Sequence, residues 1–163
     1  MFKVGIITAS DKGYAHERVD ESGKVIKEIV EKNGYSVAKY LVLPDDEAML
    51  SKEMIYMSDE MKVNLILTTG GTGFSERDVT PEATLKVVDK LAPGIVEAIR
   101  HYSLSITKRA MLSRAVSGIR NKTLIINLPG SPKAVRESLE YIIDTLQHGL
   151  EILQGIASEC ARK

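Results

Sequence analysis

Residues 65–73 have the sequence Leu-Ile-Leu-Thr-Thr-Gly-Gly-Thr-Gly, an apolar run that passes through two threonines into a glycine-rich end. Residues 63–67 are mostly branched and apolar, without the alternation of a half-exposed strand, and therefore predict a short buried strand. Glycines after a strand let backbone N–H groups approach a phosphate, because no Cβ stands in the way. A tight turn whose glycines only satisfy backbone geometry is the alternative, and the glycines alone leave both interpretations open.

A charged pair and a helix start follow this loop in the segment Arg77-Asp78-Val79-Thr80-Pro81. Thr80 is a favourable N-cap and Pro81 a favourable first helical residue, so we expect a helix over about 81–91. A strand, a glycine loop, a carboxylate and a helix start in succession indicate an anion site with an acidic side chain beside it.

The rest of the chain alternates between strand and helix patterns. Strands are expected at 3–8, 36–43 and 122–128, and helices from Ser22 to about 32, at about 47–60 and 94–105, and from Pro132 onward. Residues 14–21 and the basic stretch 106–120 show no regular pattern. We therefore predict a single α/β domain over residues 1–163, a three-layer α/β/α sandwich with a mostly parallel central sheet.

Polar or glycine-rich segments follow four of the predicted strands: Ser10-Asp11, Pro44-Asp45-Asp46, the glycine loop and Leu128-Pro129-Gly130-Ser131. Each has a structural explanation, since Ser10 and Asp11 suit a turn, and Asp45 or Asp46 suits a helix N-cap. In an open parallel sheet, however, ligands bind at the carboxyl ends of the strands. We therefore expect these segments to meet at one edge of the sheet.

Composition narrows the class of protein. Hydrophobic residues make up 44% and charged residues 27% of the chain, as in an ordinary globular protein, and 22 basic residues balance 22 acidic ones. Zero net charge argues against a general nucleic-acid binder. The single cysteine, Cys160, is interpreted as an incidental thiol. The sequence shows no signal-peptide pattern and no apolar run of membrane-spanning length, so we expect a cytoplasmic protein without a membrane partner.

Several site types lack their motifs. The sequence contains no G-x-x-x-x-G-K-[ST], no G-x-G-x-x-G and no G-x-S-x-G, and its three histidines share no motif. A phosphate-binding loop with nearby carboxylates remains, which suits Mg²⁺-assisted nucleotidyl or phosphoryl transfer, because one or two aspartates suffice when phosphates and water complete the Mg²⁺ shell. Lys108, Arg109 and Arg114 are the basic candidates for neutralising phosphate, whereas Lys133 and Arg136 are expected at the surface.

The motifs at residues 68–73, 77–84, 110–114 (Ala-Met-Leu-Ser-Arg) and 127–132 (Asn-Leu-Pro-Gly-Ser-Pro) occur together and in order. In this combination the sequence resembles the molybdopterin adenylyltransferase (MogA/MoaB) family over nearly the whole chain. The resemblance implies a usually trimeric α/β/α domain that acts in molybdenum cofactor synthesis. It also implies a reaction in which AMP passes from Mg-ATP to the terminal phosphate of molybdopterin, with release of pyrophosphate.

The resemblance further implies roles for individual residues. Asp45 and Asp78 match the functional aspartates of the family, as catalytic and Mg²⁺-binding residues. Residues implied to bind the nucleotide or molybdopterin are Ser10, Asp11, Thr69, Gly70, Gly71, Thr72, Gly73, Ser113, Arg114, Pro129, Gly130 and Ser131. Expected partners are ATP, molybdopterin, further copies of the chain and a downstream molybdenum-insertion protein. A non-catalytic pterin- or nucleotide-binding scaffold of the same fold is the alternative, and another nucleotide-dependent enzyme is a third hypothesis.

Overall fold

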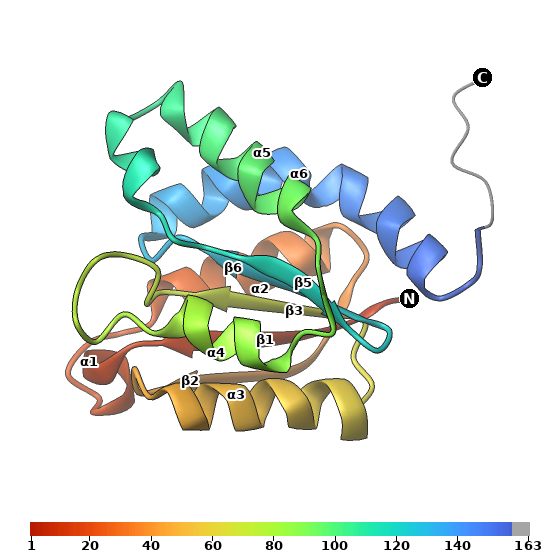
Figure 1. Cartoon of the computed structure of the whole chain (residues 1–163), viewed down its shortest axis with the longest axis horizontal. Helices are drawn as coiled ribbons and strands as arrows, with labels where there is room; N and C mark the ends of the chain where they lie inside the picture. The colour runs from red at the N-terminus through yellow and green to blue at the C-terminus, as the bar shows by residue number, and fades with distance from the viewer. Residues whose placement is uncertain (158–163) are drawn as a thin grey trace.

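A computed structural model of the chain describes residues 1–157, built around one six-stranded sheet (Figure 1). The strand order is β2-β1-β3-β6-β5-β4. The first four strands in this order are parallel to one another, and β5 and β4 continue the sheet in antiparallel pairing. The strands are β1 (Lys3–Ala9), β2 (Ser36–Leu43), β3 (Leu65–Thr69), β4 (Lys90–Leu91), β5 (Ser117–Arg120) and β6 (Thr123–Leu128).

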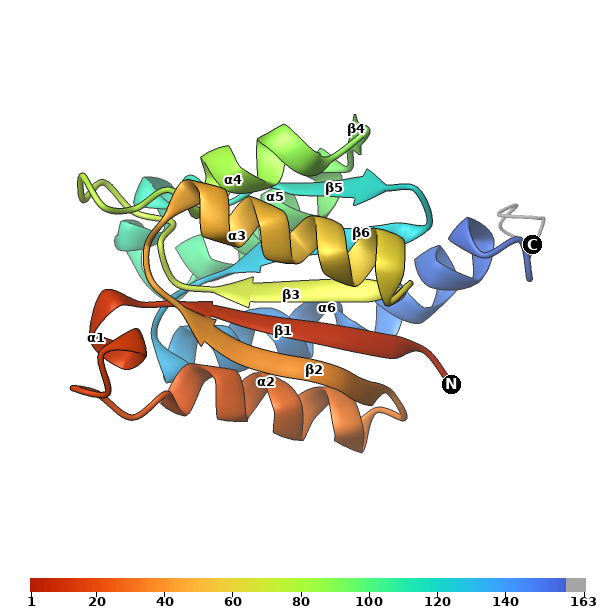
Figure 2. The ribbon, with the colours of Figure 1, turned by 90° about the horizontal axis from the view of Figure 1, so that it is seen from below.

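Helices cover both faces of the sheet (Figures 1 and 2). They are α1 (Asp11–Tyr14), α2 (Glu21–Lys32), α3 (Glu47–Ile55), α4 (Thr80–Val87), α5 (Pro93–Leu104) and α6 (Pro132–Leu153), with a π-helix η1 (Tyr56–Glu60) and a 3₁₀ helix η2 (Lys108–Leu112). Alternate side chains of the central strands enter two separate cores. Ile6 and Leu67 pack with α2, α5 and α6, whereas Ile7 and Ile66 pack with α3 and α4. This confirms the predicted three-layer α/β/α fold.

The local signals for the long C-terminal helix are confirmed. Ser131 accepts a hydrogen bond from the Ala134 N–H, and Pro132 is the first helical residue, as its fixed φ favours. Of the acidic pair Asp45-Asp46, it is Asp46 that caps α3, by accepting a hydrogen bond from the Met49 N–H at 2.8 Å. Asp45 is therefore free of a capping role.

The strand of the glycine motif begins later than predicted. The expected strand at 63–67 is observed at Leu65–Thr69, because the Val63 N–H donates to Met57 O within η1. Both threonines therefore lie inside the sheet. Thr69 is fully buried between Thr8 and Leu128 of the neighbouring strands.

The helix after Thr80 ends earlier than the predicted residue 91. It stops at Val87 because Asp89 and Ala92 donate backbone hydrogen bonds to Ile119 and Ser117 of β5. This pairing makes the short strand β4. Gly118 permits it, since a Cβ there would lie 2.9 Å from the Lys90 carbonyl oxygen. Neither β4 nor β5 was expected from the pattern of 81–120.

Topology determines where a ligand site can form. β2 and β3 lie on opposite sides of β1 in the sheet. The connections that follow β1 and β3 therefore run in opposite directions, and they leave space for a ligand between them at the carboxyl edge. Figure 2 shows α1 and the loop after β3 projecting from this same edge. Among the helices of residues 1–157, none combines the length and the hydropathy that a membrane span requires. Cys160 lies outside the described residues.

Candidate active site

The glycine loop is fixed in a conformation that only glycine adopts without strain. Gly70 has φ of +90° and Gly71 has φ of +69°. A Cβ on Gly70 would lie 2.4 Å from the carbonyl oxygen of Ala9, so the loop presses directly against the end of β1. The first two glycines of the loop are therefore required by the fold, whatever else they bind.

Thr80 secures the loop instead of capping a helix. It was predicted as the N-cap, but Val79 occupies that place and Thr80 is the first residue of α4. The Thr80 hydroxyl donates to Gly70 O at 2.9 Å, and its N–H donates to Gly71 O at 3.1 Å. These two hydrogen bonds join the start of α4 to the glycine loop at the end of β3.

Directly beside this loop lies a cavity of about 620 Å³, here called the carboxyl-edge cavity. Segments from β1, β2, β3 and β6 all contribute to its wall, as the predicted convergence requires. The predicted site residues that line it are Ser10, Asp45, Thr69, Gly70, Gly71, Asp78, Gly130 and Ser131. Ser22 at the start of α2 donates to Gly130 O at 2.6 Å, which fixes the β6 side of the cavity.

Asp45 has one carboxylate oxygen without a partner. Its Oδ2 accepts a hydrogen bond from the Asp11 N–H at 3.0 Å, whereas its buried Oδ1 accepts none. Burial raises the pKa of Asp45; the Asp11 N–H opposes this rise, and the nearby charges of Asp11 and Asp78 add to it. Within residues 1–157 no group donates a hydrogen bond to Oδ1, so this oxygen is available to a bound cation.

Asp78 lies close to the glycine loop and contributes to the same cavity wall. Its Oδ2 accepts from the Ser75 N–H at 3.1 Å, and a Cβ on Gly73 would lie 2.9 Å from that oxygen. Within residues 1–157 no three His, Cys, Asp or Glu side chains are grouped to hold a metal by themselves. Two carboxylates, one with an orphaned oxygen, fit Mg²⁺ when phosphate oxygens and water supply its other ligands.

Asp11, predicted to bind substrate, has both carboxylate oxygens engaged by the protein. Oδ2 accepts from Arg77 Nε at 3.0 Å, and Oδ1 accepts from Arg77 Nη2 at 2.9 Å and from the Asp45 N–H at 3.0 Å. The Arg77 hydrogen bonds, followed by the Asp45 N–H, lower the pKa of Asp11. Asp11 does not line the carboxyl-edge cavity, and it contacts the site through its hydrogen bonds with Asp45.

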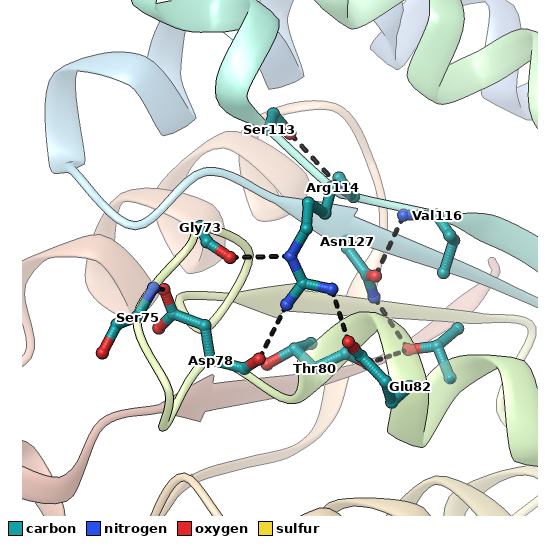
Figure 3. A network of polar contacts seen from close by, with 11 residues as sticks. Gly73, Ser75, Asp78, Thr80, Glu82, Ser113, Arg114, Val116 and Asn127 are labelled. Carbon is teal, nitrogen blue, oxygen red and sulfur yellow. Dashed lines mark hydrogen bonds and ion pairs between the residues drawn. The ribbon is translucent and has the colours of Figure 1, made fainter.

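The guanidinium of Arg114 is hydrogen-bonded to other parts of the protein (Figure 3). Arg114 is not among the residues that line the carboxyl-edge cavity. Its Nε donates to Gly73 O and its Nη2 to Asp78 O, each at 2.7 Å, while Nη1 pairs with Glu82. The Arg114 N–H also donates to Thr72 O at 2.8 Å. Arg114 thus shapes the loop between the third glycine and Asp78.

The remaining predicted site residues border a second, less polar cavity of about 280 Å³, here called the α5 cavity. These residues are Thr72, Gly73, Ser113 and Pro129. Apolar side chains such as Ile99 and Leu112 line it together with Arg109. Since Gly71 lines one cavity and Thr72 the other, the glycine loop forms the wall between them.

Sequence patterns missed the contribution of the segment before α2. Arg18 and Asp20 line the carboxyl-edge cavity, although the sequence shows no regular pattern over residues 14–21. Asp20 caps α2 by accepting from the Gly23 N–H, and it also accepts from Thr8 Oγ1 at 2.7 Å and from the Tyr40 hydroxyl. The cap signal Asp20-x-x-Gly23 was available in the sequence, but the exposed Arg18 carried none.

Comparison with known proteins places this geometry in a family. A family model described as a probable molybdopterin binding domain matches residues 5–148. The chain is 41% identical over 154 residues to the molybdopterin adenylyltransferase of Helicobacter pylori strain J99, covering 93% of this chain and 88% of that protein.

Solved structures agree with this match. The molybdopterin biosynthesis enzyme MoaB of Thermus thermophilus superimposes with a TM-score of 0.90 at 46% identity, covering 95% of this chain and 98% of that one. The tungsten cofactor synthesizing protein MoaB of Pyrococcus furiosus gives 0.83 at 34% identity, with 94% and 98% covered. The chain therefore belongs to the MogA/MoaB family of molybdopterin-binding domains.

Proposed function

We propose that this chain is a molybdopterin adenylyltransferase, which transfers AMP from Mg-ATP to the terminal phosphate of molybdopterin. The observation that carries the proposal is the shared cavity of Asp45, Asp78 and the glycine loop. The relatives named molybdopterin adenylyltransferase support it, because the similarity covers almost the whole chain.

In the proposed reaction, a terminal phosphate oxygen of molybdopterin attacks the α-phosphorus of ATP. The bond from this phosphorus to the bridging oxygen of the β-phosphate breaks, and pyrophosphate leaves. The attacking phosphate is largely ionised at neutral pH, so no strong general base is needed. The remaining requirements are alignment of the two phosphates and neutralisation of their charge.

The residues of the carboxyl-edge cavity suit these requirements. Asp45 and Asp78 would hold Mg²⁺, which when bound neutralises phosphate charge and fixes the triphosphate. Gly70 and Gly71 line this cavity, and the backbone N–H groups of the loop would contact the phosphates. Arg18 is the one basic side chain among the described residues that line this cavity, and it adds positive charge to a wall that also carries the carboxylates.

The α5 cavity suits the pterin. Planar heterocycles favour a mostly apolar pocket with a few polar groups, and Ile99, Leu112 and Pro129 supply the apolar wall while Ser113 and Arg109 supply polar groups. With the glycine loop between the two cavities, a phosphate attached to the pterin would approach the triphosphate across that loop. We further propose that the protein is a homotrimer, which sedimentation equilibrium tests directly.

The activity is tested by pyrophosphate release from ATP with Mg²⁺ and molybdopterin. We expect release by the wild type only when all three are present, and at least about 100-fold slower release by Asp45→Asn. Asp46→Asn is the matched control, because asparagine caps a helix as well as aspartate does.

Three other outcomes contradict the proposal. Equal rates for Asp45→Asn and the wild type would remove Asp45 from the mechanism. Binding of both ligands without pyrophosphate release would favour a scaffold. Turnover without molybdopterin would favour another nucleotide-dependent enzyme.

A further inference from the structure

Three side chains tie together the loops that follow β1, β2 and β3. Asp45, after β2, and Asp11, after β1, exchange hydrogen bonds: each backbone N–H donates to the carboxylate of the other residue at 3.0 Å. Arg77, beyond the glycine loop, then grips Asp11 with two donors, Nε at 3.0 Å and Nη2 at 2.9 Å. The segments joined lie 34 and 66 residues apart in the chain.

Of the four carboxylate oxygens of Asp11 and Asp45, one has no hydrogen-bond partner within residues 1–157. Both oxygens of Asp11 are used by Arg77 and by the Asp45 N–H, and Oδ2 of Asp45 is used by the Asp11 N–H. Oδ1 of Asp45 is buried without a hydrogen bond, and it lies close to Gly71, where a Cβ would be 3.2 Å away. The orientation of this oxygen therefore depends on the contacts that hold Asp11.

The ion pair between Arg77 and Asp11 contributes little to the overall stability of the protein. The Arg77 side chain is 62% exposed and that of Asp11 is 43% exposed, and exposed pairs are screened by solvent. A two-donor arginine–carboxylate contact is nevertheless geometrically strict. Such a pair fixes the direction of a neighbouring group without adding much to the free energy of unfolding.

We propose that Asp11 and Arg77 are positioning residues, which orient Asp45 so that its free Oδ1 is presented to the metal ion of the nucleotide. The inference rests on the proposed function for the identity of that ion. Asp11 then acts through Asp45 and does not touch substrate. Arg77 links the orientation of Asp45 to the conformation of the loop beyond Gly73.

The test uses Arg77→Gln, Asp11→Asn and the double variant in the full chain, with Arg136→Gln as the control. Arg136 also forms a two-donor surface contact, with Glu28 and Glu140, but it lies on α6 and lines neither cavity. Three quantities are measured: ATP affinity by calorimetry in EDTA and across a Mg²⁺ titration, Mg²⁺ dependence of pyrophosphate release, and hydrogen exchange of the Asp11 and Asp45 amides.

We expect both single variants to raise the Mg²⁺ concentration for half-maximal ATP binding by about tenfold, which corresponds to about 1.4 kcal/mol. ATP affinity in EDTA, kcat at saturating Mg²⁺ and the melting temperature stay near wild type. The Asp11 and Asp45 amides exchange faster. The double variant is no worse than the single ones, because both substitutions break the same contact. Arg136→Gln behaves as wild type.

Wild-type Mg²⁺ dependence of ATP binding in both single variants overturns the positioning role, as does a wild type whose ATP binding ignores Mg²⁺. Additive losses in the double variant also overturn it, since the residues would then act separately. Failure of the proposed function is recognised differently, by a wild type that binds Mg-ATP and releases no pyrophosphate. In that event the binding titration and the exchange rates still decide whether Asp11 and Arg77 orient Asp45.

Discussion

At the scale of single residues, the environment of Asp45 suits metal binding but lowers the stability of the unliganded protein. Burial raises the pKa of its carboxyl, and Asp11 and Asp78 lie near enough to raise it further. An acid whose pKa is higher in the folded than in the unfolded chain lowers stability when it ionises. This loss is present at neutral pH and is recovered as the pH falls through the raised value toward the unfolded value of about 4.

Asp45→Asn should therefore stabilise the unliganded protein at pH 7, although it slows pyrophosphate release at least about 100-fold. Each 1 kcal/mol of stabilisation would raise the melting temperature by roughly 2–4 °C in a chain of this size. Thermal unfolding between pH 7 and pH 4 checks this, and the gain should shrink as the pH falls. A variant less stable than the wild type at pH 7, or a pH-independent gain, would contradict the assigned burial.

Gly70 makes the second prediction at this scale. Alanine there must adopt φ of +90° and place its Cβ 2.4 Å from Ala9 O, so Gly70→Ala should destabilise by about 1–3 kcal/mol or more and disturb the loop. Gly94→Ala is the control, because a Cβ at this helical position meets no atom within 4 Å. It should be neutral or stabilising by up to about 1 kcal/mol in urea unfolding. Equal effects of the two substitutions would contradict the close packing of Gly70.

At the scale of elements, Arg114 joins the segment before β5 to the loop and helix after β3. Its three guanidinium nitrogens donate separately to Gly73 O, Glu82 and Asp78 O, whereas a lysine ammonium carries its donors on one nitrogen and does not match this spacing. Arg114→Lys should therefore speed hydrogen exchange in residues 73–78 and raise the KM for ATP several-fold. Arg136→Lys, a surface change that keeps the charge, should do neither. Unchanged exchange in Arg114→Lys would show that other contacts hold the loop.

Local signals in the sequence predicted the elements whose ends depend on local chemistry. The cap Ser131 and Pro132 fixed the start of α6, and the apolar runs at 3–8 and 122–128 identified β1 and β6. The order of these elements was enough to predict which loops share the carboxyl edge.

Features that depend on distant partners were not predicted. The end of α4 depends on backbone pairing with β5, some 30 residues away in the chain, and no local signal in 81–91 reports it. The same applies to the site: the motifs identified Asp11 and Arg114, but only the fold shows that both are engaged by other parts of the protein.

At the scale of the whole molecule, four parallel strands in the order β2-β1-β3-β6 bring their carboxyl ends to one edge. That edge carries Asp45, Asp78 and the glycine loop around a single cavity, with the less polar α5 cavity on the other side of the loop. The central claim is that one nucleotide and its metal ion occupy the carboxyl-edge cavity.

The most direct test is a crystal structure of the protein with ATP and Mg²⁺ bound. The account predicts a metal ion between the triphosphate and the carboxylates of Asp45 and Asp78, with phosphate oxygens against the backbone of Gly70 and Gly71. A nucleotide bound elsewhere, for example in the groove between α5 and α6 that Tyr141 borders, with Asp45 and Asp78 free of metal, would contradict it.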